Sequence, residues 1–290
     1  MNDKLKNFLV RTLSGAVLLL VILGAMWVGY YGFLALLLFI TIGGVWEFYN
    51  LSRAKGYEPQ RGSGIVLSLL IFSVGAALGE TMAYNVPSDI LALVLLLLLA
   101  IFAVLMFGII FFVEVFRNRP TPIANIATTF AGVCYVAVPM ALMTMLPLMF
   151  TDQKEWHAIY FLFYLFLVWG NDVFAYLAGV TMGRHKMCER LSPKKSWEGF
   201  VGGVAGSLAV GALAAYCLDE SYAMWMGLAL IVSLSSVVGD LVESMFKRDA
   251  GVKDSGNILP GHGGILDRFD AFILSVPFAF IYLLLVMIAI

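Results

Sequence analysis

The sequence predicts an all-α, polytopic integral membrane protein with about nine transmembrane helices. Apolar residues make up 61% of the 290 residues, charged residues make up only 13%, and the mean hydropathy is +0.93. A water-soluble domain of this size carries about 25% charged residues. Long uncharged apolar runs recur along the chain, which is typical of membrane helices. The basic residues also sort to one side when these runs are threaded through a bilayer.

Nine apolar runs define the expected membrane helices. At about 1.5 Å of rise per residue, about 20 helical residues cross the ~30 Å hydrocarbon core. The fourth and fifth runs are longer, so we expect them to tilt or protrude. The first run follows a short charged N-terminus, but no cleavage site and polar mature domain come after it, which predicts a retained helix rather than a signal peptide. The runs cover about residues 8–28, 30–49, 63–80, 88–115, 123–150, 157–181, 198–217, 222–245 and 268–289.

The loop charges predict the orientation. With a cytoplasmic N-terminus and nine crossings, every Lys and Arg except Lys154 falls on the inner side, as the positive-inside rule requires. The C-terminus then lies outside, and the expected location is the cytoplasmic (inner) membrane of a bacterium. We expect residues 1–122 to form an N-terminal group of about four helices and residues 123–290 to carry the catalytic site at the cytoplasmic face.

The cysteines and the outer loops exclude several classes of protein. Cys134, Cys188 and Cys217 are odd in number and have no C-x-x-C spacing, which argues against a disulfide framework or a zinc site. The outer loops are short, so no large extracellular domain is expected. Function is therefore expected in the long polar cytoplasmic loops near residues 182–197 and 246–267.

One segment of 27 residues, from Ser244 to Asp270, differs from the rest of the chain. It holds four basic residues, four carboxylates, a histidine and a Gly-Gly pair. Charged side chains at the membrane are costly and mark functional sites. This mixture of Lys and Arg with Asp predicts that the segment binds phosphates together with a divalent metal.

Three carboxylates are the candidate metal ligands: Asp172, Asp240 and Asp267. Asp172 lies within an apolar run, and Asp267 is at the start of the last one. Asp240 lies on a helical stripe with Ser236, Glu243 or Ser244, and Lys247. Convergent carboxylates suit Mg²⁺, which commonly links carboxylates to substrate phosphates.

The alternative for each acid is an ion pair with Arg or Lys at the membrane edge. This alternative stays open for Asp172, Glu198 and Asp270. It is the favoured interpretation for Glu47, Glu114, Glu189, Asp249 and Asp254.

Three groups of residues are candidates for phosphate binding. The first lies at the start of the helix expected from residue 198, where free N–H groups and the helix dipole favour anions; it comprises Ser192, Lys194, Lys195 and Ser196. The second is a basic cluster of Lys247, Arg248, Lys253 and Arg268. The third is glycine-rich and comprises His262, Gly263 and Gly264, where backbone amides can approach a phosphate closely. Topology alone also accounts for lysines in these loops, and a structural hydrogen bond is the alternative for His262.

The segment from Ser244 to Asp270 resembles the signature of the phosphatidate cytidylyltransferase (CDP-diacylglycerol synthase) family. That signature has the form S-x-hydrophobic-K-R-x4-K-D-x-small-x2-L-P-x-H-G-G-hydrophobic-x-D-R-hydrophobic-D, and this sequence satisfies every position. A second stretch, from Asp172 to Gly199, is also similar to the family through D-x-x-A-Y-x-x-G, then G-R, then S-P-x-K-S-x-E-G. The resemblance in polar residues covers about residues 169–272, whereas the N-terminal helices agree only in hydropathy and length.

The resemblance implies a nucleotidyltransferase that converts CTP and phosphatidic acid to CDP-diacylglycerol and pyrophosphate. It implies Mg²⁺ held by Asp240 and Asp267, with a monovalent cation such as K⁺ beside it, and a homodimer in the lipid bilayer. Lys247 and Arg268 join these two aspartates as the expected catalytic residues, because cations offset the repulsion between two anionic substrates. No nucleic-acid partner is expected.

Two rival functions remain. A CTP-dependent polyprenol kinase would share the nucleotide and the multi-helix architecture, but the intact H-G-G-x-x-D-R-x-D run argues against it. A cation transporter would use buried acids along a path. Its path would need polar residues through the full membrane depth, whereas residues 93–100 and 161–168 are almost wholly apolar.

Overall fold

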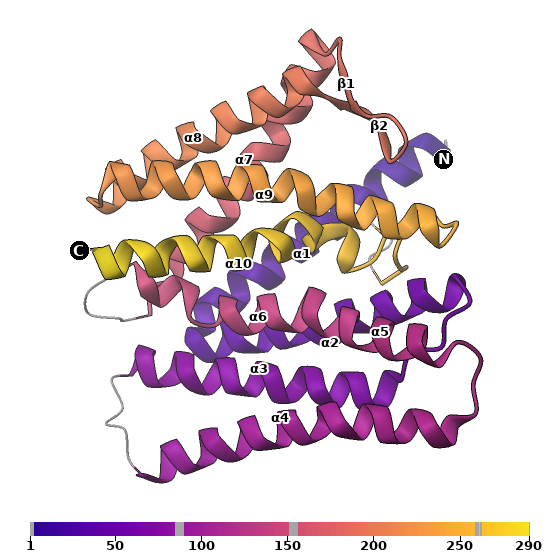
Figure 1. Ribbon diagram of the computed structural model, residues 1–290. Helices are drawn as coiled ribbons and strands as arrows, with labels where there is room; N and C mark the ends of the chain where they lie inside the picture. The colour runs from indigo at the N-terminus through magenta and orange to yellow at the C-terminus, as the bar shows by residue number, and fades with distance from the viewer. Residues whose placement is uncertain (1–2, 85–89, 151–155, 259–260, 262, 290) are drawn as a thin grey trace.

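The computed structural model describes residues 3–84, 90–150, 156–258, 261 and 263–289, and it is almost entirely helical (Figure 1). In chain order the elements are α1 (Asp3–Val28), α2 (Tyr30–Ala54), α3 (Arg61–Ala83), α4 (Ile90–Arg117), α5 (Pro122–Gly132), the π-helix η1 (Val133–Ala137), α6 (Val138–Met143), the 3₁₀-helix η2 (Leu146–Met149), α7 (Ala158–Met182), β1 (Lys186–Cys188), β2 (Ser192–Ser196), α8 (Trp197–Leu218), α9 (Tyr222–Asp249) and α10 (Leu266–Ala289).

The helices have the length and composition of membrane spans. Among the described residues, eight stretches are long and apolar enough to cross a bilayer, counting α5, η1 and α6 as one, and residues 12–28 of α1 form a shorter apolar helix. The predicted polytopic, all-α membrane fold is therefore confirmed. Many large apolar side chains point outward, for example along α4, because the solvent of such a surface is lipid.

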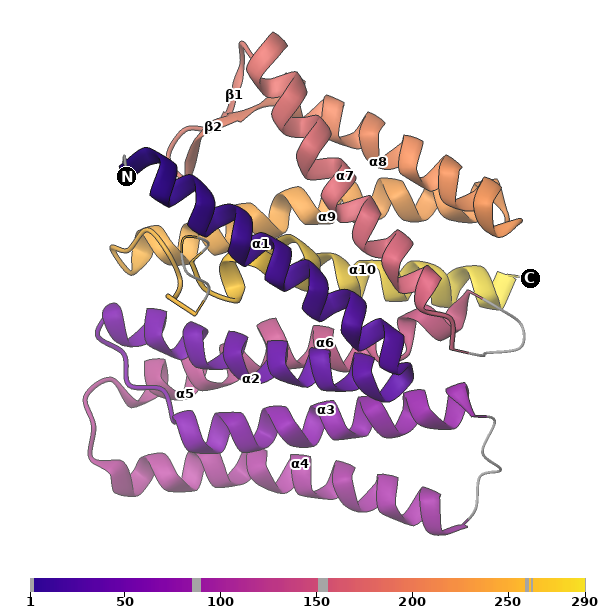
Figure 2. The ribbon, with the colours of Figure 1, turned by 180° about the vertical axis from the view of Figure 1, so that it is seen from behind.

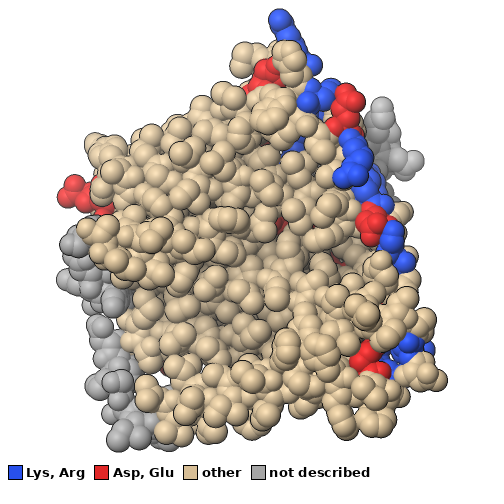
Figure 3. Space-filling view, in the orientation of Figure 1, with Lys and Arg blue, Asp and Glu red and all other residues tan. Residues whose placement is uncertain are grey.

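The charged elements gather at one end of the bundle, which we call the polar end. The N-terminal ends of α1, α3, α5, α8 and α10, the C-terminal ends of α2, α4, α7 and α9, and both strands lie there (Figures 1 and 2). On the face drawn in Figure 3, the Lys and Arg atoms lie along this edge alone. The described basic residues thus share one side of the bundle, as predicted; the side chains of Lys4, Lys6, Arg11 and Lys154 lie outside the described part of the chain.

Small residues let the helices that carry the site approach closely. A Cβ atom at Gly203 of α8 would lie 2.9 Å from the backbone oxygen of Asn171 on α7, so only glycine fits at this crossing. Of two buried apolar clusters among the described residues, the larger runs from Ile22 to Leu283. It takes residues from both sides of position 122, and the division into two helix groups stays a prediction.

The fifth expected helix is interrupted. Its predicted range was residues 123–150, but α6 ends at Met143, and the π-helix η1 comes between α5 and α6. In η1 the Val138 N–H bonds the Val133 oxygen, five residues back. Pro139 follows directly, has no N–H to donate, and its ring crowds the carbonyl four residues earlier, that of Tyr135. A widened turn at this position relieves that crowding.

A short β-hairpin was not predicted. Residues 186–188 and 192–196 pair antiparallel, with Lys186 opposite Ser196 and Cys188 opposite Ser192. The sequence gives no alternating apolar pattern here, so it predicted only a polar loop. The hairpin brings the lysines of β2 back over the polar end of α7 and α9.

Candidate active site

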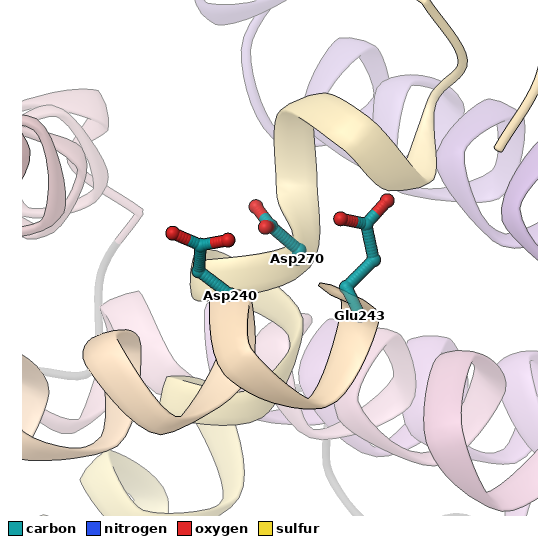
Figure 4. A group of neighbouring side chains, drawn as sticks. All are labelled: Asp240, Glu243 and Asp270. Carbon is teal, nitrogen blue, oxygen red and sulfur yellow. The ribbon is translucent and has the colours of Figure 1, made fainter. Parts of the chain in front are cut away.

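Three carboxylates meet at the polar end of α9 and α10: those of Asp240, Glu243 and Asp270. One oxygen from each lies within 4.8 Å of the others. Asp240 and Glu243 project from neighbouring turns of α9, and Asp270 reaches between them from α10 (Figure 4). We call this group the acid cluster.

Local sequence explains why these acids converge. Asp240 and Glu243 are three residues apart, which places them on one helix face. Gly239 lets α10 approach that face, because a Cβ there would lie 2.7 Å from the backbone oxygen of Asp270. The close approach of α9 and α10 therefore brings the third carboxylate to the first two.

Lys247 links the acid cluster to Asp267. Its Nζ atom forms an ion pair with Glu243, one turn earlier on α9, and lies 2.7 Å from Asp267 Oδ1. All three side chains are largely buried, with exposed fractions of 13% for Lys247, 1% for Glu243 and 5% for Asp267. Buried charges require such compensation.

Asp267 is held by further donors from the glycine-rich segment. Its Oδ2 atom accepts hydrogen bonds from the backbone N–H of Ser255 at 2.8 Å, the Ser255 hydroxyl at 2.9 Å and the backbone N–H of Gly264 at 2.8 Å. Gly263 has φ of 83°, and a Cβ there would lie 2.5 Å from the same oxygen. A residue with a side chain would therefore both strain this turn and displace the carboxylate.

Glu47 anchors the same segment from α2. It is buried, with 1% of its surface exposed, and accepts hydrogen bonds from the backbone N–H groups of Ile265 at 3.0 Å and Leu266 at 2.9 Å. The Ser255 hydroxyl adds a third bond at 3.2 Å. The expected Arg or Lys partner is wrong for Glu47 among the described residues, because the free N–H groups at the start of α10 bind it instead.

The same expectation is confirmed for two other acids. Glu114 pairs with Arg117 at 2.7 Å, and Asp249 pairs with Lys55 at 2.7 Å. Glu198, left open by the sequence, lies 2.5 Å from the ring nitrogen of His185 and accepts bonds from backbone N–H groups of the loop after α7.

One lysine of the hairpin, Lys195 of β2, reaches the acid cluster. Lys195 forms an ion pair with Asp240 at 2.5 Å. Lys194 is exposed, and Ser192 is half-buried. Ser196 caps α8 by accepting the Gly199 N–H at 3.1 Å, so its hydroxyl takes up one of the N–H groups at the helix start where the sequence predicted anion binding.

Two cavities border the acid cluster, and Asp172 lines both. The first, of about 490 Å³, lies between α7, α8, α9 and the hairpin, and it exposes Lys194, Lys195 and Asp240. The second, of about 260 Å³, lies between α1, α7 and α10, with Arg268 and Asp270 among its lining residues. Gly15, Leu18 and Ile22 of α1 give this second cavity an apolar side.

The structure thus brings most of the predicted site residues to one end of the bundle. Asp172 and Asp240 meet at the first cavity, whereas Asp267 is separated from the acid cluster by Lys247. Arg248 and Lys253 are exposed near this end, and His262 lies outside the described residues. The roles of all these residues as ligands stay predictions.

Two residues of the acid cluster were not among the metal ligands predicted from the sequence. Glu243 appeared only as part of a stripe, and Asp270 was left open between ion pair and ligand. The signal for both was present, since D-x-x-E on α9 and D-x-x-D on α10 each place two acids on one helix face. Only the crossing of the two helices shows that both acids of the α9 pair meet Asp270, and not Asp267, of the α10 pair.

Comparisons with known proteins agree with this architecture. The sequence profile of the cytidylyltransferase family matches residues 9–286. A Synechocystis sp. protein named phosphatidate cytidylyltransferase is 33% identical over 285 residues, covering 89% of this chain and 90% of that protein. Proteins of the same name from Staphylococcus aureus and Staphylococcus saprophyticus are 49% identical over 132 residues and 51% identical over 120 residues, or 44% and 41% of this chain.

The Staphylococcus matches cover 51% and 46% of those proteins, so the chain spans about half the length of these curated relatives. The family profile, by contrast, extends over nearly all nine apolar helices and includes the acid cluster, Lys195, Lys247 and Asp267. On this evidence the chain belongs to the cytidylyltransferase family.

Proposed function

We propose that the protein transfers the cytidylyl group of CTP to phosphatidic acid, giving CDP-diacylglycerol and pyrophosphate. The observation that carries this proposal is the meeting of three carboxylates with Lys195 and Lys247 at the polar end of a membrane-spanning bundle. Both substrates are anionic, so they can react only where opposite charge is fixed in place. That place must border water for the nucleotide and hydrocarbon for the acyl chains.

In the proposed reaction a phosphate oxygen of phosphatidic acid attacks the α-phosphorus of CTP. A new P–O bond forms there, and the bond from the α-phosphorus to the oxygen bridging to the β-phosphate breaks, releasing pyrophosphate. Positioning and charge neutralisation supply most of the catalysis in such transfers. The attacking phosphate is largely ionised near neutral pH, so the residues of this site need not remove a proton from it.

The two cavities fit two substrates. The cavity with Lys194 and Lys195 offers two cations to the phosphates of CTP. The cavity between α1, α7 and α10 combines Arg268 with apolar side chains, which suits a phosphate attached to a lipid. We further propose that the polar end faces the cytoplasm at a bacterial inner membrane, where CTP is available.

The acid cluster fits Mg²⁺. Its donors are carboxylate oxygens, the ligands that this ion prefers, and Glu243 Oε1 is a buried atom with no hydrogen-bond partner among the described residues. We propose that Asp240, Glu243 and Asp270 contribute ligands, with Asp267 supplying the ligand that the family resemblance implies. When bound, Mg²⁺ would neutralise phosphate charge and stabilise the leaving group. A monovalent cation such as K⁺ is a second proposed cofactor, and a homodimer is the proposed assembly.

The direct test incubates purified protein with CTP, Mg²⁺ and phosphatidic acid in mixed micelles. The proposal expects pyrophosphate and CDP-diacylglycerol in equal amounts. Release of CDP with phosphorylation of a polyprenol would identify the kinase instead, and cation flux through liposomes without chemistry would identify a transporter. Replacing K⁺ by a large organic cation tests the second ion in the same assay.

Two variants test the assigned ligands. Asp240→Asn and Asp267→Asn are each expected to insert into the membrane and to lose nearly all Mg²⁺-dependent turnover, because an amide binds a hard cation weakly. A folded variant that keeps wild-type turnover would remove that residue from the ligand set. Size-exclusion chromatography and a thermal unfolding curve establish folding.

Lys195→Ala tests the nucleotide side of the site. It is expected to raise the KM for CTP more than it lowers kcat, because the lysine would contact phosphates before and during the reaction. Lys55→Ala is the matched control, since Lys55 is also at the polar end but pairs with Asp249 at 2.7 Å on the exposed surface. An unchanged KM for CTP in Lys195→Ala would leave this lysine with a topological role only.

A further inference from the structure

The phenol group of Tyr135 is a buried donor without a partner. Its hydroxyl has almost no exposed surface and makes no hydrogen bond among the described residues. Other buried tyrosines of this protein are partnered: Tyr49 donates to the Thr129 oxygen at 2.8 Å, and Tyr164 lies 2.7 Å from the Ser275 hydroxyl. A buried tyrosine hydroxyl ordinarily has a hydrogen-bond partner, so the unpartnered hydroxyl of Tyr135 indicates that a bound ligand supplies the acceptor.

The position of the ring explains where that ligand binds. Tyr135 packs against Phe48 of α2 and edge-on against Phe246 of α9, with ring centroids 5.9 Å and 5.4 Å away. Phe246 lies three residues after Glu243 on α9, which places both side chains on one face of that helix. The ring of Tyr135, which η1 carries, is therefore held beside the face of α9 that carries Glu243 of the acid cluster.

The backbone that holds Tyr135 is unusual. The residue lies in the π-helix η1, in the middle of a membrane span, and π-turns inside helices occur frequently at functional sites. Pro139 fixes the place of this turn, and the aromatic contacts fix the ring. A neutral donor is thereby held rigidly beside three acids, where a bound cation would attract an anionic oxygen.

We propose that the Tyr135 hydroxyl is a substrate-contacting residue of this site, donating a hydrogen bond to a phosphate oxygen of the ligand bound at the acid cluster. This inference rests on the proposed cytidylyl transfer. The phosphate belongs either to CTP or to phosphatidic acid, and both present the same anionic acceptor. Neutral hydroxyl donors stabilise such oxygens without adding charge to the site.

Tyr135→Phe removes only the hydroxyl, and Tyr164→Phe is the matched control. Because Tyr135 has no protein partner to lose, its variant should unfold at the wild-type temperature or higher but lose at least tenfold in kcat/KM. Tyr164→Phe loses a buried hydrogen bond, so it should unfold at a lower temperature and keep the wild-type kcat/KM. Kinetics equal to wild type in a folded Tyr135→Phe would overturn the proposal.

The same variant identifies the source of the phosphate. A raised KM for CTP, with a smaller thermal stabilisation by CTP and Mg²⁺ in the absence of lipid, assigns the contact to the nucleotide. A raised KM for phosphatidic acid with unchanged stabilisation by CTP assigns it to the lipid. If the wild-type protein fails to turn over CTP, the proposed function fails. The Tyr135 contact is then tested alone, by the rise in unfolding temperature that inorganic pyrophosphate and Mg²⁺ cause. A smaller rise in Tyr135→Phe than in the wild type supports the contact, and an equal rise refutes it.

Discussion

Glu47 on α2 accepts a hydrogen bond from the backbone N–H of Leu266 on α10 at 2.9 Å, across 219 positions of sequence. Its other oxygen accepts the Ile265 N–H at 3.0 Å. The first N–H groups of a helix have no partner within the helix and form the positive end of its dipole, so a carboxylate there is favourable. This contact fixes the start of α10, and with it the positions of Asp267 and Asp270 relative to α9.

Glu47→Gln is therefore expected to destabilise the protein. One acceptor oxygen is replaced by an NH₂ group that faces a backbone N–H, which costs about 1–3 kcal/mol for an unsatisfied buried group. Unfolding by sodium dodecyl sulfate in mixed micelles measures the loss. Glu58→Gln is the control, because Glu58 makes a partly exposed contact with Arg119 at 3.3 Å. Equal stability of the two variants would contradict the role of Glu47 as an anchor.

Lys247→Met is expected to be more damaging. The substitution keeps the length of the side chain but leaves Glu243 and Asp267 buried without their shared cation. Removing one partner of a buried ion pair costs about 3–5 kcal/mol, and added Mg²⁺ should recover part of this loss by binding the carboxylate oxygens that Lys247 no longer pairs. Unfolding curves with and without Mg²⁺ measure both effects. Lys55→Met, which breaks an exposed pair, should leave the curve unchanged, and a similar effect of the two substitutions would argue against the buried link.

Gly203→Ala tests the packing of α7 on α8. The added methyl group would lie 2.7 Å from Asn171 Oδ1 and 2.9 Å from the Asn171 backbone oxygen. Because neither neighbour is the free end of a flexible chain, the helices must separate, at a cost of about 1–3 kcal/mol. Gly108→Ala is the matched control on α4, where a Cβ meets nothing within 4 Å. That change should be neutral or stabilising by up to about 1 kcal/mol. Equal unfolding curves for both would show that the crossing tolerates a side chain.

The native cysteines report the orientation. Cys188 lies in β1 at the polar end, and Cys217 lies in the last turn of α8 at the opposite end. In intact cells, a membrane-impermeant maleimide should label a variant that retains only Cys217. A variant that retains only Cys188 should be labelled only once the membrane has been permeabilised. Labelling of Cys188 in intact cells would reverse the proposed topology and would place the site away from cytoplasmic CTP.

Hydropathy and charge were sufficient to predict the helices of this protein. The eight long spans have 22 to 28 residues each. The thickness of the bilayer imposes this length, and its lack of water requires every backbone N–H and C=O group to be hydrogen-bonded within the protein. Polar residues are rare in such a chain, so the segment from Ser244 to Asp270 stood out as the candidate site. Both signals are local, because they depend on the immediate surroundings of each residue.

Contacts between distant helices could not be predicted in this way. The sequence indicated that Asp240 and Asp270 lie at helix ends, but the packing of α9 on α10 around Gly239 decided that they meet Glu243. It likewise predicted an Arg or Lys partner for Glu47, whereas the donors are backbone N–H groups more than 200 residues later. The interruption at η1, which carries Tyr135, depends on how one turn accommodates Pro139. The sequence alone thus determined the spans and the gathering of the described basic residues at one end of the bundle, and it predicted the orientation and the chemical character of the site. The tertiary structure decided which charges meet, because that depends on the angle and depth at which packed helices cross.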